Sequence, residues 1–180
     1  MELLKEFKPA LMFLGKFLAL YFAGNILYGI YIESYEQADG VTRLVTAQTS
    51  WCLDHTGYDT SIEDVVGQPK IAMKATGDVV LYVFEGCNGL NVMIVFIAFL
   101  FAFGGPLKTL ALFLPLGILI IHLFNLLRIG LLYHLALNDS RQFYYYHKYF
   151  FTAILYIVVF GLWAVWVIRF NEKRKLKATA

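Results

Sequence analysis

Apolar residues run through this chain in long, nearly uninterrupted blocks and do not alternate with polar residues at helical or strand spacing. A helix that crosses the roughly 30 Å hydrocarbon core of a bilayer needs about 20 mostly apolar residues. Four blocks reach or approach that length, at about residues 10–32, 88–103, 107–137 and 149–168. The pattern predicts an all-α integral membrane protein with about four transmembrane helices, forming a single membrane domain over residues 1–180.

Individual blocks depart from uniform hydrophobicity in informative ways. The first carries only Lys16, near its start, where the side chain can snorkel to the headgroups, so we interpret this block as a retained span that also directs insertion. The second is the shortest. The third exceeds one bilayer crossing and contains Pro115 and Gly117, which predict a kink. It holds no charged residue between Thr109 and Arg128.

Residues 33–86 separate the first two blocks and predict a loop with its own secondary structure. Residues 41–53 favour a short helix on the membrane interface. Two short runs of strand-forming residues, 70–74 and 79–83, flank the turn sequence ATGD and predict a β-hairpin. Such a hairpin delivers the following residues to the membrane surface.

Composition and charge set the orientation. The chain is 59% hydrophobic and 17% aromatic, as expected for a membrane protein. Lys5, Lys8 and the four Lys or Arg residues within the tail 173–177 predict that both termini are cytoplasmic, with a basic cytoplasmic tail at 169–180. The loop 33–86 holds nine acidic and three basic residues and is predicted to lie outside a bacterial inner membrane. Anionic lipids explain the basic ends, so nucleic-acid binding is not predicted.

A cysteine stands directly before the second block, in the sequence EGCNGLN of residues 85–91. Arg128 follows Lys108 by twenty residues, or roughly 30 Å of helix, which carries it from the inner to the outer boundary. His147 precedes the fourth block at its outer end. We therefore expect Cys87, Arg128 and His147 to meet at the outer face.

These side chains suit thiol chemistry. A cysteine with an ordinary pKa near 8.5 becomes nucleophilic when a neighbouring cation or base favours the thiolate. In this hypothesis His147 transfers the proton and Arg128 stabilises negative charge. Backbone N–H groups of Asn88 and Gly89 are expected to support the oxyanion. Asn125 shares the face of Arg128 three positions earlier, where it would orient the guanidinium or a substrate carbonyl.

Simpler interpretations stay open for each residue. Cys87 is compatible with a disulfide to Cys52 or with a small buried apolar position. Arg128 is compatible with snorkelling to headgroups, and Asn125 with helix packing. Two further histidines, His122 and His134, lack a second ligand at metal spacing, so helix packing is predicted and no metal site.

The motifs CNGL at 87–90 and NLLRI at 125–129, followed by His147, resemble the exosortase and archaeosortase family of membrane cysteine transpeptidases. The order and topological placement of the three motifs agree with that family, and the chain is similar to its compact exosortase variants. The resemblance implies that Cys87, Arg128 and His147 are the catalytic residues and that the reaction requires no metal or organic cofactor.

The resemblance also implies a protein-sorting reaction. Its substrates would be exported proteins whose C-terminus carries a short motif, a transmembrane helix and a basic tail. Cys87 would cleave before that helix and pass the acyl group to an amine acceptor or to water. The alternative is a non-catalytic membrane scaffold or assembly partner in an export or polysaccharide system, which predicts that Cys87→Ala is tolerated.

Overall fold

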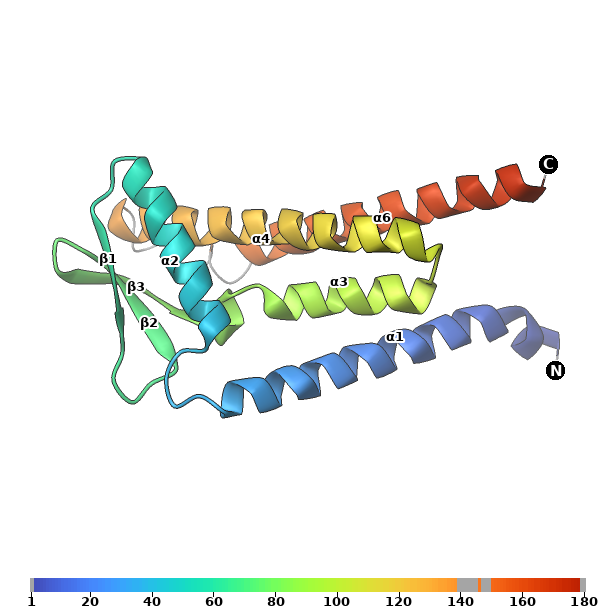
Figure 1. Ribbon diagram of the computed structural model, residues 1–180, viewed down its shortest axis with the longest axis horizontal. Helices are drawn as coiled ribbons and strands as arrows, with labels where there is room; N and C mark the ends of the chain where they lie inside the picture. Colours follow the sequence, from blue (N-terminus) through green and yellow to red (C-terminus); the bar gives the residue numbers. More distant parts are fainter. Residues whose placement is uncertain (1, 139–145, 147–149, 179–180) are drawn as a thin grey trace.

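The computed structural model describes residues 2–138, 146 and 150–178, with side chains described within 7–138, 146 and 150–169. Four of the described helices run along the long axis of the molecule, and a fifth helix with a three-stranded sheet lies across one end (Figure 1). Both termini lie at the opposite end. The long helices are α1 (Glu2–Glu33), α3 (Leu90–Phe103), α4 (Leu107–Asn138) and α6 (Phe151–Ala178).

The outward faces of the long helices are apolar. Leu27, Leu112 and Ile157 are about two-thirds or more exposed, whereas soluble proteins rarely leave broad apolar surfaces uncovered. Three helices in the described part of the chain are long and apolar enough to cross a bilayer, and α3, with 14 residues, is shorter. These surfaces are those of a membrane protein, and a fourth crossing through α3 stays a prediction.

Close helix contacts depend on glycine. A Cβ placed on Gly117 of α4 would lie 2.2 Å from the ring of Phe96 in α3, so only glycine lets these two helices approach as they do. A Cβ placed on Gly24 of α1 would likewise lie 2.7 Å from Cγ2 of Ile94 in α3. Pro115 is contained within α4.

The predicted interfacial helix is present as α2 (Gly40–His55). Asp39 caps its start by accepting hydrogen bonds from the N–H groups of Val41, at 2.9 Å, and Thr42, at 3.1 Å. The inward face of α2 is rich in hydroxyl groups, and Trp51 is 62% exposed on the outward face. An apolar side chain turned outward fits a helix that lies against lipid.

The predicted hairpin is confirmed as β2 (Lys70–Ala75) and β3 (Asp78–Phe84), which pair antiparallel. Thr76 and Gly77 form the turn with positive φ angles of 49° and 94°, the backbone that two-residue hairpins favour. The prediction was incomplete, because β1 (Thr60–Asp64) adds a third strand in the order β1-β2-β3.

The added strand pairs antiparallel with β2 and also forms ion pairs that sequence periodicity does not reveal. Arg43 of α2 donates two hydrogen bonds to Asp64, at 2.6 and 2.9 Å, and Lys74 of β2 pairs with Glu63. A strand whose sequence is TSIED lacks the alternating apolar pattern of a half-buried strand. Its place in the sheet depends on antiparallel pairing with β2, from Thr60 opposite Ala75 to Asp64 opposite Ile71, and the partly exposed ion pairs add little.

Candidate active site

Cys87 ends a short 3₁₀ helix, η1 (Glu85–Cys87), which connects β3 to α3. The thiol is buried, with 6% of the residue exposed, within an apolar cluster that includes Val83, Ile129 and Leu132. Cys52 is exposed on α2, and the two cysteines are not joined in a disulfide. The disulfide interpretation is therefore not the state of this structure.

Burial raises the pKa of the Cys87 thiol above its ordinary value, because a thiolate loses solvation there. The positive charge of Arg128 and a backbone hydrogen bond from Phe84 act in the opposite direction, and the charge of Glu85 adds to the effect of burial. Burial dominates, so the resting side chain is the protonated thiol at neutral pH.

Arg128 lies on α4 and is itself buried, with 9% of the residue exposed. Its Nε atom has no hydrogen-bond partner among the described residues. A buried guanidinium with an unused donor is rare, because burial of an unsatisfied polar group is costly. Arg128 therefore places a positive charge and a buried, unused hydrogen-bond donor near Cys87, while its catalytic role stays a prediction.

Asn125 connects the arginine-bearing helix to the cysteine. Its Nδ2 atom donates a 2.9 Å hydrogen bond to the backbone carbonyl of Cys87, and its Oδ1 atom is buried with no partner among the described residues. A Cβ on Gly89 would lie 3.1 Å from Cγ of Asn125. Two of the three residues that the sequence assigned to site support, Gly89 and Asn125, are thus packed against each other.

Asn88 is fully buried and joins three helices. Its Nδ2 atom donates to the hydroxyl oxygens of Tyr28 in α1, at 2.7 Å, and Thr42 in α2, at 3.1 Å, while its Oδ1 atom accepts from the N–H of Leu90, at 2.9 Å. The backbone N–H of Asn88 lies 3.5 Å from the carbonyl of Glu85. The side chain of Asn88 fixes the segment that carries Cys87.

Tyr28 and Thr42 were not among the residues that the sequence singled out. The hydroxyl of Tyr28 also donates to the carbonyl of Glu85, at 3.2 Å, so α1 holds the cysteine-bearing segment at two points. One polar atom at the end of an apolar block is a weak signal, because interfacial tyrosines are common in membrane proteins.

His147 lies outside the described residues. The preceding residue, Tyr146, packs against the apolar cluster that contains Cys87. Of the two histidines on α4, His122 makes the kind of helix contact that was predicted, with its Nε2 atom 2.7 Å from Oε1 of Gln48 in α2. His134 is hydrogen-bonded to the hydroxyl of Tyr58, which lies in the connection between α2 and β1.

A groove of about 290 Å³ leads to Cys87 between the sheet and α4. Its walls are five consecutive residues of β3 and two apolar residues of α4. The lining residues are Val80, Leu81, Tyr82, Val83, Phe84, Cys87, Ile129 and Leu132.

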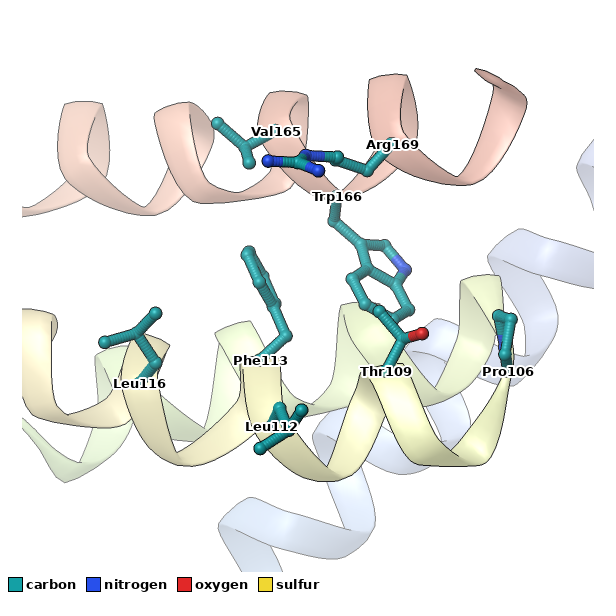
Figure 2. Close-up of a pocket in the computed structure, with 8 residues that line it drawn as sticks. All are labelled: Pro106, Thr109, Leu112, Phe113, Leu116, Val165, Trp166 and Arg169. Atoms are coloured by element: carbon teal, nitrogen blue, oxygen red, sulfur yellow. The ribbon is translucent and has the colours of Figure 1, made fainter. Parts of the chain in front are cut away.

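Figure 2 shows a larger cavity, of about 460 Å³, between α4 and α6 at the end of the molecule near the termini. Leu112, Phe113 and Trp166 give it an apolar wall, and Arg169 lies at its edge. It contains no cysteine or histidine and none of the candidate site residues. The groove at Cys87 is therefore the better candidate for a reactive site.

A bundle of apolar helices with a cysteine and an arginine buried together at its sheet-bearing end defines a membrane protein with a candidate thiol site. The family model described as Transmembrane exosortase (Exosortase_EpsH) matches residues 3–170, and the chain belongs to this family. The resemblance found in the sequence motifs is thereby confirmed. Comparison with curated proteins and with solved structures gives no match.

Proposed function

We propose that the protein is a membrane cysteine protease and transpeptidase that cleaves the C-terminal sorting signal of exported proteins. The observation that carries this proposal is the placement of a buried thiol, Cys87, at the end of a groove and within the electrostatic influence of the buried Arg128. A purely structural cysteine needs neither a groove nor a neighbouring buried guanidinium whose Nε atom has no hydrogen-bond partner among the described residues. Membership of the exosortase family supports the same activity.

In the proposed reaction, His147 accepts the proton of the Cys87 thiol, and the thiolate attacks the carbonyl carbon of the scissile peptide bond. The carbonyl oxygen becomes an oxyanion, which the unused Nε donor of Arg128 is suited to bind. The carbon–nitrogen bond then breaks, and the leaving amine takes the proton from His147. The product is a thioester between Cys87 and the exported protein.

The thioester is resolved by an amine acceptor, which gives a transferred protein, or by water, which gives a carboxylic acid. In either case the nucleophile loses a proton, and Cys87 regains it as the thiol leaves. The hydrogen bond from Asn125 to the carbonyl of Cys87 fixes the backbone on which the nucleophile stands. Asn88 holds the same segment through its side-chain hydrogen bonds, and Gly89 holds it as the N-cap of α3.

The proposed location is the outer face of a bacterial inner membrane. Both basic termini lie at one end of the molecule and Cys87 is on the segment that joins the sheet at the other end to α3 (Figure 1). If the basic ends are cytoplasmic, as charge asymmetry favours, Cys87 faces the compartment that receives exported proteins. The substrates would carry a recognition motif, a transmembrane helix and a basic tail.

The test is chemical modification of Cys87 from outside, in a Cys52→Ser background. Spheroplasts are treated with a small membrane-impermeant methanethiosulfonate over a range of pH, and Cys87→Ala serves as the blank. Modification from outside, at a rate that falls when Arg128 or His147 is replaced by alanine, is the expected result.

A Cys87 that stays unmodified at every pH, in folded and membrane-inserted protein, contradicts the enzyme proposal. The alternative function, a non-catalytic membrane scaffold or assembly partner, then becomes the better account. Normal protein sorting in cells that carry Cys87→Ala would support the same conclusion.

A further inference from the structure

β3 forms an edge of the sheet that is unusually apolar. The described strands pair in the order β1-β2-β3, so β3 pairs with β2 on one side only. Residues 79–84 of β3 are six apolar residues in succession, without a charge or a proline. The opposite edge, β1, carries Glu63 and Asp64, both of which form ion pairs. Proteins normally protect exposed strand edges with such charges, so the unprotected edge of β3 calls for a partner.

The register identifies which backbone groups face that edge. The carbonyl of Lys70 accepts a hydrogen bond from the N–H of Val65, at 3.1 Å, so the backbone polar groups of Lys70 point toward β1. Direction alternates along a strand, so those of Ile71 point toward β3. Ile71 is opposite Val83, which therefore directs its N–H and C=O groups to β2.

By the same alternation, Tyr82 and Phe84 direct their N–H and C=O groups away from β2, toward the open edge. The backbone hydrogen bond between Phe84 and the Cys87 thiol agrees with this direction. The backbone groups of Tyr82 lie one step further along the same edge. The edge thus offers peptide hydrogen bonds next to the proposed nucleophile.

The groove at Cys87 follows this edge. Successive side chains of a strand point to opposite faces, so a cavity on one face touches only every second residue. This groove is lined by all five residues from Val80 to Phe84, which places it along the backbone edge. Its other wall is Ile129 and Leu132 of α4, and it reaches Cys87.

We infer that the open edge of β3 binds the substrate segment that precedes the scissile bond, as an added strand that runs parallel to β3. This inference rests on the proposed function. The strand runs toward the membrane helices, from the turn at Gly77 to Cys87 (Figure 1). An exported chain runs the same way, because its transmembrane helix follows the cleavage point. Both chains therefore approach the thiol from the same side.

The partner is an extended peptide with apolar side chains at alternate positions. Its amide groups pair with Tyr82 and the neighbouring edge positions, and the side chains that face α4 meet Ile129 and Leu132. Backbone pairing supplies affinity for many sequences, and the apolar wall excludes charged side chains at the facing positions. A second copy of this chain on the same edge is the competing occupant.

The experiment uses the full chain in nanodiscs, in a Cys52→Ser background, with three peptide vinyl sulfones. The parent probe is an acetylated peptide of four residues, alternating valine and alanine. Two isomers carry backbone N-methyl groups, one on the first and third residues and one on the second and fourth. Alternate amides of an extended peptide face opposite edges, so only one isomer loses its bonds to β3.

We expect one isomer to modify Cys87 about tenfold more slowly than the parent, as expected for the loss of one or two peptide hydrogen bonds, and the other to keep a rate within about threefold. Iodoacetamide is the control for the thiol itself. Equal rates for the two isomers, with Cys87 still reactive to iodoacetamide, overturn the inference and leave the proposed function standing. A Cys87 inert to iodoacetamide overturns both.

A variant pair tests the edge on the protein side. Tyr82→Pro removes the N–H that faces the groove, and Tyr82→Thr removes the ring and keeps the N–H. The inference predicts that the two isomers react at equal rates with the proline variant and at different rates with the threonine variant. The rate of Cys87 modification by iodoacetamide should be unchanged in both variants. The inference is contradicted if Tyr82→Cys forms a disulfide-linked dimer under oxidation and the wild type shows no difference between the isomers. That combination of results assigns the edge of β3 to a second copy of this chain.

Discussion

Gly89 is the position at which a single added methyl group tests the geometry around Cys87. Its φ angle of 83° lies in the left-handed region, where an alanine costs about 1–2 kcal/mol. Its Cβ would also meet Asn125 at 3.1 Å from Cγ and 3.2 Å from Nδ2, which is the atom that binds the carbonyl of Cys87. Overpacking of this kind costs about 1–3 kcal/mol. The expected destabilisation by Gly89→Ala is the sum, about 2–5 kcal/mol.

Gly57→Ala is a matched control. Gly57 has a φ angle of 94° and nothing within 4 Å of the position of an added Cβ, so it carries the backbone cost without the contact. The free energy of unfolding is measured for both variants in mixed detergent–SDS micelles by tryptophan fluorescence. The rate of Cys87 alkylation by iodoacetamide is measured in parallel, in a Cys52→Ser background.

The expected outcome is a larger loss of stability for Gly89→Ala than for Gly57→Ala, with the alkylation rate of Cys87 changed only in the Gly89 variant. A change in rate follows because Asn125 is displaced from the backbone that carries the thiol. Equal losses of stability and unchanged alkylation in both variants would show that Asn125 and Gly89 are not packed as described here.

Three further predictions concern the site and the helix packing that supports it. Asn88→Ala removes hydrogen bonds to three partners in a fully buried position and should destabilise the protein by about 2–4 kcal/mol in the same unfolding assay. Asn88→Asp should destabilise the protein at least as much, because it buries a charge. Gly117→Ala places a methyl group 2.2 Å from the ring of Phe96 and should cost about 1–3 kcal/mol, and Gly161→Ala, which meets nothing within 4 Å, should not. Because burial raises the pKa of Cys87, its alkylation rate should still rise with pH above the range in which ordinary thiols ionise. The charge of Arg128 lowers that pKa, so Arg128→Gln should move the pH profile of alkylation to higher pH. A profile that moves to lower pH contradicts the assigned electrostatics.

Local signals in the sequence were sufficient for the elements that deliver the cysteine. The turn sequence at 75–78 between two strand-forming runs specifies the β2–β3 hairpin. The helix predicted over 41–53 is present as α2, whereas its cap at Asp39 was not predicted. Helix length alone placed Arg128 at the depth of Cys87, because rise per residue is nearly constant. These predictions rest on chain geometry that neighbouring residues determine.

Contacts between distant residues were not predictable in the same way. β1 depends on its pairing with β2, because its own sequence lacks an alternating apolar pattern. The junction of Tyr28, Thr42 and Asn88 joins residues up to 60 positions apart. The second block was expected to become helical at residue 88, but α3 begins at Leu90 because Gly89 is left-handed. One sequence carries no pairing information for such contacts, and the prediction for His147 falls outside the described residues.

Burial of Cys87 is compatible with the proposed location of the groove on the outer, oxidising side of the membrane. A thiolate that is always present would oxidise readily, whereas a buried thiol with a raised pKa is slow to react. The described ion pairs lie on the sheet, at Asp64 and Glu63, and none neutralises Arg128. The positive charge of Arg128 therefore stabilises the anions that the reaction creates, first on the sulfur of Cys87 and then on the substrate oxygen, more than it stabilises the resting thiol. Stabilisation that is stronger in the transition state than at rest is what accelerates a reaction. A protonated resting cysteine is thus compatible with catalysis in the proposed enzyme.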